Sequence, residues 1–127
     1  MTQLAPKVHS TRFAELAQTA KNRIREITVQ ELKEKLASNQ PFYLIDVREE
    51  SEFSKGYIAN ALHLSKGIIE RDIEKHISNP AAEIVLYCSG GYRSALAADN
   101  LQKMGYINVA SVVGGLTAWL NEGNSLN

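Results

Sequence analysis

The stretch that decides the fold of this chain is Glu83-Ile84-Val85-Leu86-Tyr87-Cys88-Ser89-Gly90-Gly91-Tyr92-Arg93-Ser94-Ala95-Leu96. Its first part, residues 84–87, is a continuous apolar run, which is typical of a buried parallel strand. After it, Ala97, Leu101 and Met104 recur on one face of a predicted helix. A cysteine, two glycines and an arginine lie between the two patterns. The stretch therefore predicts a strand, a tight loop and a helix that begins near Ser94.

The loop has the composition of an anion-binding site built around a cysteine. Loops at the carboxyl ends of parallel strands form the usual ligand crevice of open α/β sheets. Gly90 and Gly91 permit positive φ, so successive N–H groups point inward, while the helix N-terminus and Arg93 add positive charge. This setting favours the thiolate of Cys88, the only cysteine, and predicts a nucleophile. A lone cysteine is more commonly a small apolar residue of the core, but that alternative does not explain the glycines and Arg93.

The rest of the chain supplies the other elements of an α/β protein. Further strands are expected to start near Ile27, Phe42, Ala61 and Val109, and amphipathic helical patterns separate them. We expect Ser65 to cap the helix that follows the third strand. Strands that alternate with helices predict a parallel five-stranded sheet with helices on both faces.

A further amphipathic helix is predicted before the first strand. Its apolar residues at helical spacing are Phe13, Leu16, Ala17, Ala20 and Ile24, with Ser10 or Thr11 as its cap. The pattern assigns no chemistry to this helix, which either covers the body of the domain or meets a second subunit. We therefore divide the chain into an N-terminal helical extension, residues 1–24, and a domain, residues 25–127.

Composition excludes several classes of partner. Lys plus Arg and Asp plus Glu number 14 each, so no net field attracts nucleic acid or an anionic membrane. No apolar run is long enough to span a membrane, and residues 1–10 lack the apolar core of a secretory signal. A single cysteine excludes an internal disulfide and suits a reducing compartment. These features favour a cytoplasmic protein, and they do not choose an oligomeric state.

A second set of polar residues follows the predicted strand 42–47. Asp46 and Arg48 lie at the carboxyl end of this strand, on the same sheet edge as Cys88. Asp46 either orients the cysteine loop, pairs with a cation, or caps the short helix expected near residues 49–53, and we favour the cap. Tyr92 either gates the cysteine site or is exposed by chance.

Other clusters carry less chemistry. His9, His63 and His76 show no ligand spacing, so the sequence predicts no metal site. The glycine pair lacks the lysine of a nucleotide-binding loop.

The residues 88–93 resemble the active-site loop of the rhodanese-like sulfurtransferases, with cysteine first, glycine fourth and arginine sixth. The run 44–49 with Glu52 and Phe53 is similar to the amino-terminal signature of that family. Gly114-Gly115 followed by Trp119 resembles its carboxyl-terminal motif. Tyr57 and Ala59-Asn60 depart from the family's histidine and proline-glycine. The resemblance covers about residues 28–123.

This resemblance implies a three-layer fold and a sulfur-transfer reaction. Cys88 takes a sulfane sulfur from thiosulfate or a protein persulfide, carries it as a persulfide, and passes it to a thiol acceptor. The resemblance implies that Arg93 is a catalytic residue, which either helps to stabilise charge on the terminal sulfur or braces the loop through its hydrogen bonds, and that Asp46 and Arg48 support the site. The substrate-binding residues of the loop are Ser89, Gly90, Gly91, Tyr92 and Ser94. The family chemistry requires no metal or organic cofactor.

Two alternatives remain open. A cysteine phosphatase or arsenate reductase uses a similar cradle, but related phosphatases place five residues between cysteine and arginine, where Cys88 and Arg93 enclose four. A sulfur carrier or oxidation sensor with one protein partner and little turnover is the second alternative. Ser89 and Glu52 stand where rhodaneses that use thiosulfate well carry basic residues, so we expect slow transfer from thiosulfate.

Overall fold

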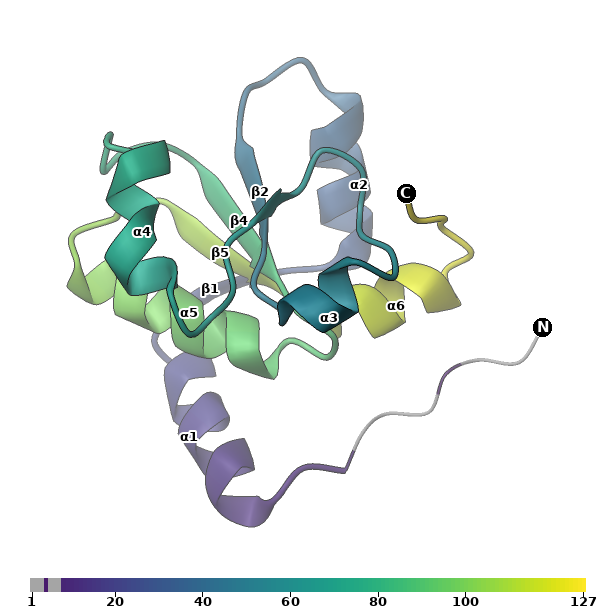
Figure 1. The fold of residues 1–127 in the computed structure, drawn as a ribbon, viewed down its shortest axis with the longest axis horizontal. Helices are drawn as coiled ribbons and strands as arrows, with labels where there is room; N and C mark the ends of the chain where they lie inside the picture. Colours follow the sequence, from purple (N-terminus) through teal and green to yellow (C-terminus); the bar gives the residue numbers. More distant parts are fainter. Residues whose placement is uncertain (1–3, 5–7) are drawn as a thin grey trace.

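The computed structural model describes residue 4 and residues 8–127 and contains one parallel sheet (Figure 1). Its strands are β1 (Arg25–Ile27), β2 (Tyr43–Asp46), β3 (Leu62–His63), β4 (Ile84–Tyr87) and β5 (Val109–Val112). They are ordered β1-β5-β4-β2-β3, and every neighbouring pair is parallel. The predicted parallel five-stranded sheet is confirmed, with β4 at its centre.

Helices cover both faces of the sheet. They are α1 (Thr11–Lys21), α2 (Val29–Ala37), α3 (Glu50–Phe53), α4 (Ile69–His76), α5 (Tyr92–Lys103) and α6 (Gly115–Asn121). Alternate residues of a strand point to opposite faces. On one face Ile84 and Leu86 pack in a cluster with residues of α4 and α5. On the other, Val85 and Tyr87 pack with residues of α2 and α6, so the fold has three layers.

Helix α1 packs outside these layers against α5 (Figure 1). Ala17 and Ala20 are completely buried, whereas Leu16, which the pattern placed on the buried face, is 58% exposed. Arg23 donates to both carboxylate oxygens of Asp99, at 3.0 and 2.6 Å, and thereby ties the end of α1 to α5. The N-terminal helix therefore covers the body of the protein.

Two local predictions are wrong: the group of Ser65 that caps α4, and the residue at which α5 begins. Ser65 does not cap α4 with its side chain: its backbone carbonyl accepts from Ile68 and Ile69 instead. Helix α5 begins at Tyr92, two residues earlier than expected, because Gly91 at φ 92° already turns the chain into the helix. Met104, expected on the apolar face of this helix, follows its last residue as the C-cap and is 39% exposed.

No helix within residue 4 and residues 8–127 has the length and apolar character needed to cross a membrane.

Candidate active site

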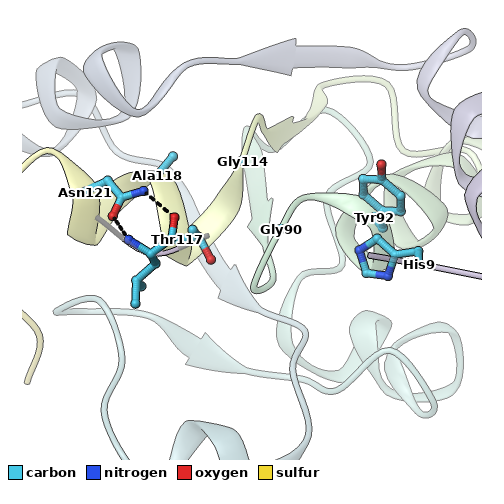
Figure 2. Close-up of a pocket in the computed structure, with 8 residues that line it drawn as sticks. His9, Gly90, Tyr92, Gly114, Thr117, Ala118 and Asn121 are labelled. Atoms are coloured by element: carbon cyan, nitrogen blue, oxygen red, sulfur yellow. Dashed lines mark hydrogen bonds between the residues drawn. The ribbon is translucent and has the colours of Figure 1, made fainter. Parts of the chain in front are cut away.

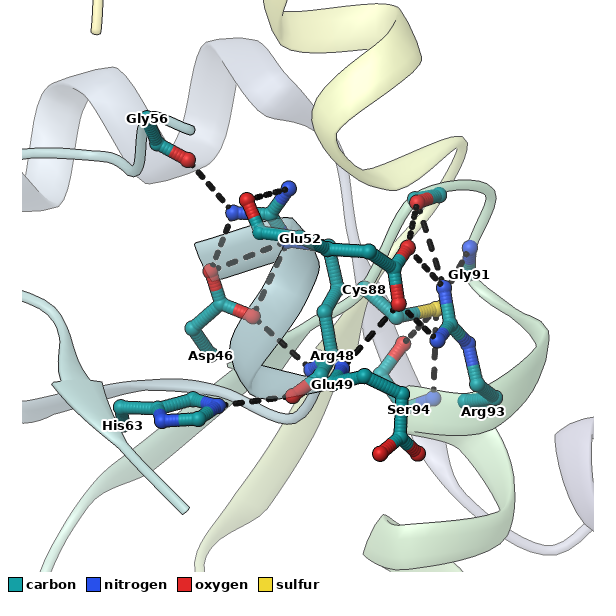
Figure 3. Close-up of polar contacts among 11 residues, drawn as sticks. Asp46, Arg48, Glu49, Glu52, Gly56, His63, Cys88, Gly91, Arg93 and Ser94 are labelled. Carbon is teal, nitrogen blue, oxygen red and sulfur yellow. Dashed lines mark hydrogen bonds and ion pairs between the residues drawn. The ribbon is translucent and has the colours of Figure 1, made fainter. Parts of the chain in front are cut away.

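Cys88 lies directly after β4, and its side chain is buried, with 1% exposed. The backbone N–H groups of Gly91 and Ser94 donate to its Sγ at 3.1 and 3.4 Å, and the hydroxyl of Ser94 lies 3.4 Å from it (Figure 3). Backbone N–H groups that converge on one sulfur atom stabilise negative charge there. The expected cradle is therefore present, although Gly91 takes positive φ and Gly90 does not.

The start of α6 holds the cysteine loop from behind. Leu116 N–H donates to the carbonyl of Cys88 at 2.8 Å, and Thr117 N–H donates to that of Ser89 at 3.0 Å. These bonds require close approach of the two backbones at Gly115, where an added Cβ would lie 2.3 Å from the Cys88 carbonyl oxygen. This close approach is a direct steric reason for a glycine at position 115.

A hydroxyl pair lies beneath the sulfur. Ser94 Oγ lies 2.8 Å from Ser111 Oγ of β5, and both residues are completely buried. A serine inside an otherwise apolar strand, residues 109–113, is the signal that sequence reasoning missed. Each hydroxyl is therefore hydrogen-bonded, as buried polar groups generally are.

Arg93 forms a two-pronged ion pair with Glu52 of α3. Its Nη1 and Nη2 donate to the two carboxylate oxygens at 2.7 and 3.0 Å, and Ser89 Oγ lies 3.2 Å from both partners. The hydrogen bond from Arg93 lowers the pKa of Glu52 to about 2. Among the described residues, no hydrogen bond joins Arg93 to Cys88 Sγ. The positive charge of the loop is therefore balanced, and its arginine braces the loop against α3.

Asp46 and Arg48 form a buried pair next to this brace (Figure 3). Asp46 accepts from the backbone N–H of Arg48 at 2.9 Å and from its Nη2 at 2.7 Å, and the same Nη2 donates to the Gly56 carbonyl at 2.7 Å. The expectation that Asp46 caps the short helix is wrong, because the N-cap residue is Glu49, whose backbone N–H donates to Glu52 Oε1 at 3.1 Å. The alternative that Asp46 pairs with a cation is confirmed. Asp46 holds Arg48, and Arg48 holds the chain that follows α3.

An open cavity of about 440 Å³ leads to the sulfur. Its walls are formed by His9, Phe13, Glu52, Cys88, Ser89, Gly90, Tyr92 and Arg93. Of the predicted loop residues, Ser89, Gly90 and Tyr92 line the cavity, whereas Gly91 and Ser94 reach the site through their N–H groups at Cys88 Sγ. The pair Asp46–Arg48 lies outside the walls. His9 and Phe13 were not expected here, because the sequence assigned no chemistry to the N-terminal helix.

A second cavity of about 200 Å³ shares His9, Gly90 and Tyr92 with the first (Figure 2). The backbone of Leu4 makes two hydrogen bonds with the side chain of Asn121 at its edge, at 2.9 and 3.3 Å. The two cavities therefore adjoin each other at His9, Gly90 and Tyr92.

Other histidines have structural positions. His63 Nε2 lies 2.7 Å from the Arg48 carbonyl oxygen, and its ring stacks on Phe53. His76 is exposed at the end of α4. Within residue 4 and residues 8–127, no group of three or more His, Cys, Asp or Glu side chains is placed to hold a metal ion.

Sequence comparison identifies relatives of this arrangement. Residues 28–122 match the model of the rhodanese-like domain. A candidate sulfurtransferase of Bacillus subtilis (strain 168), YtwF, is 37% identical over 99 residues, which make up 78% of this chain and 93% of that protein.

Solved structures extend the similarity beyond the residues of the family match. The polysulfide-sulfur transferase homodimer of Wolinella succinogenes has a TM-score of 0.77 and 28% identity, covering 91% of this chain and 87% of that chain. A protein of Rhodopseudomonas palustris CGA009, described as of unknown function and a candidate tyrosine phosphatase, has the same score and identity over 97% and 99% of the chains. The similarity therefore reaches into the N-terminal region.

Proposed function

The chain belongs to the rhodanese-like family, and we propose that it transfers sulfur through a persulfide on Cys88. The observation that carries this proposal is the position of Sγ. The sulfur lies at the base of an open cavity, with two backbone N–H groups directed at it. A thiolate held in this way can attack an electrophilic sulfur. The same N–H groups then stabilise the negative charge on the outer sulfur of the persulfide that forms.

The reaction has two displacement steps. In the first, the Cys88 thiolate attacks the outer sulfur of a donor R–S–SH; the donor S–S bond breaks, and R–S⁻ leaves with the electron pair. The product is Cys88–S–SH. In the second, an acceptor thiolate attacks the same outer sulfur, and the Cys88 thiolate leaves. Neither step needs an external oxidant or reductant, and the covalent intermediate divides one difficult transfer into two.

The charge balance of the cavity favours particular donors. Thiosulfate is a dianion, and the arginine that would attract it is neutralised by Glu52 at 2.7 and 3.0 Å. A persulfide carries at most one negative charge at the reacting sulfur. We therefore expect a protein persulfide to react faster than thiosulfate, and a thiol to be the acceptor.

The similarity to a candidate tyrosine phosphatase favours a second function, phosphate-ester hydrolysis. Four residues separate Cys88 from Arg93, and Arg93 is turned toward Glu52. A phosphate needs a wider ring of donors together with an arginine free to bind its oxygens. We expect negligible phosphatase activity.

Parallel turnover assays test this proposal. The wild-type protein is given a protein persulfide or thiosulfate with cyanide or a thiol as acceptor, and separately an aryl phosphate. Cys88→Ser is the matched control, because its hydroxyl has nearly the same shape and forms no persulfide. Sulfur transfer that Cys88→Ser lacks supports the proposal. Aryl phosphate turnover without sulfur transfer contradicts it, and a persulfide released only to one protein points to the sulfur carrier.

A further inference from the structure

One side of the Cys88 cavity consists of three rings, which we call the aromatic wall: His9, Phe13 and Tyr92. The ring centroids lie 4.2 Å apart between His9 and Tyr92, 5.2 Å between His9 and Phe13, and 5.9 Å between Phe13 and Tyr92. Each ring is thus within contact range of the other two. Two of the three belong to the N-terminal region, outside residues 28–122.

The aromatic wall is fixed by the packing of α1. Ala17 and Ala20 are buried against the body of the protein, and Arg23 is ion-paired with Asp99. Lys21 Nζ lies 4.4 Å from the centroid of the Tyr92 ring, a cation–π contact between α1 and the first residue of α5. Helix α1 therefore positions the aromatic wall through contacts that do not include Cys88.

The cavity is larger than the transferred atom requires. Backbone N–H groups of the loop bind at the sulfur of Cys88, and about 440 Å³ is open above it. The wall lines this space with aromatic rings, the charges of Glu52 and Arg93 offset each other, and the ammonium of Lys21 lies against the Tyr92 ring. Polarisable sulfur makes favourable contacts with aromatic rings, worth about 0.3–1.5 kcal/mol each. A sulfonate group gains nothing comparable from such a surface.

We propose that the aromatic wall binds the sulfur chain of the donor beyond the transferred atom, which makes α1 a determinant of donor specificity. Inorganic polysulfide, a chain of catenated sulfur atoms, is then a better donor than thiosulfate; both are dianions, so the two donors differ in the contacts of the chain with the rings and not in charge. Cys88 thiolate attacks the terminal sulfur of this chain, the adjoining S–S bond breaks, and the shortened polysulfide leaves with the electron pair. This inference rests on the proposed sulfur transfer and adds the residues that select the donor.

Phe13 is the ring to change, because it lies on α1 and is not part of the cysteine loop. Phe13→Ala removes the ring, and Phe13→Leu keeps apolar volume without it. Leu16→Ala is the matched control, since Leu16 lies on the same helix and is 58% exposed. The rate of sulfur addition to Cys88 is measured for each variant with inorganic tetrasulfide and with thiosulfate, together with the melting temperature.

Phe13→Ala is expected to slow sulfur addition from tetrasulfide about three- to tenfold, as the loss of one or two sulfur–aromatic contacts implies. The rate of Phe13→Ala with thiosulfate should stay within about twofold of the wild-type rate. With tetrasulfide, Phe13→Leu should lie between wild type and Phe13→Ala, and Leu16→Ala should match wild type. An equal loss for both donors, or no loss for either, overturns the inference while the proposed function stands. If wild type takes sulfur from neither donor, the proposed function itself fails.

Discussion

At the scale of single residues, the ion pair between Arg93 and Glu52 has the largest effect on the character of the site. The sequence left open whether Arg93 assists at the sulfur or braces the loop, and the guanidinium binds both oxygens of Glu52. Glu52 lies 41 positions away in the sequence, so its approach depends on how α3 is placed by the sheet. No local pattern reports such a pairing, although the sequence does place Glu52 on the relevant edge.

Glu52→Gln should make stability less dependent on pH. The pKa of Glu52 is lowered from 4.5 to about 2, so its ion pair stabilises the fold above pH 4.5, and this contribution disappears as the pH falls through about 2. Glutamine cannot ionise and lacks that contribution. Thermal unfolding followed between about pH 6 and pH 2 should therefore show wild type as the more stable protein at the upper end, with the difference vanishing at the lower end. A difference that is constant with pH contradicts this role of the ion pair.

Arg93→Ala should lower sulfur transfer because the loop loses its brace to Glu52, so the N–H groups directed at Cys88 Sγ are held less firmly. Because no hydrogen bond among the described residues joins Arg93 to Sγ, the loss should stay below the roughly 3 kcal/mol that removal of one directly contacting, charge-stabilising donor costs. Arg93→Lys should recover only part of the rate, since one ammonium cannot hold two carboxylate oxygens as a planar guanidinium does. Transfer rates and melting temperatures of the two variants are compared with wild type. Full activity in Arg93→Ala with a large fall in melting temperature would make the residue purely structural.

At the scale of elements, the strand, loop and helix from residue 83 to 103 follow from local patterns. An apolar run, a glycine pair and a helical repeat are adjacent in the sequence, so their arrangement needs little tertiary information. The support that α6 gives to the loop does not follow from any local pattern. It depends on the close approach of Gly115 to the carbonyl of Cys88, which becomes visible only when β4 and β5 are paired.

Gly115→Ala should damage the site more than the strain of one left-handed residue explains. Its Cβ would lie 2.3 Å from the Cys88 carbonyl oxygen, so the loop and α6 must separate. Gly123→Ala is the matched control, because Gly123 has φ 85° with nothing within 4 Å of an added Cβ. The control should lose roughly 1–2 kcal/mol of unfolding free energy and keep its transfer rate. Gly115→Ala should lose more stability and most of its activity in the same assays. Equal behaviour of the two variants would remove the role assigned to the close approach.

At the scale of the whole molecule, the N-terminal helix is the part that sequence reasoning described least well. The pattern predicted an amphipathic helix correctly, but it gave no partner for its apolar face. The structure places that face on α5 and brings Phe13 and His9 to the cysteine cavity. A helix that docks on a surface formed by distant residues leaves no motif of its own.

Removal of residues 1–24 should leave a folded domain, because the sheet and both of its helical layers lie within residues 25–127. The truncated protein should melt at a lower temperature, since it loses the burial of Ala17 and Ala20 and exposes the outer face of α5. Circular dichroism and thermal unfolding of the truncated and full chains make the comparison. A chain that fails to fold without residues 1–24 would show that the two parts form one unit.

The central claim is that Cys88 carries the transferred sulfur. Intact-protein mass spectrometry after incubation with a protein persulfide tests it most directly, with peptide mapping to locate the modification. The predicted result is one added sulfur atom on Cys88, lost on addition of a thiol acceptor and absent from Cys88→Ser. No added sulfur from protein persulfide, polysulfide or thiosulfate, with Cys88 reduced and accessible to alkylation, would contradict the account.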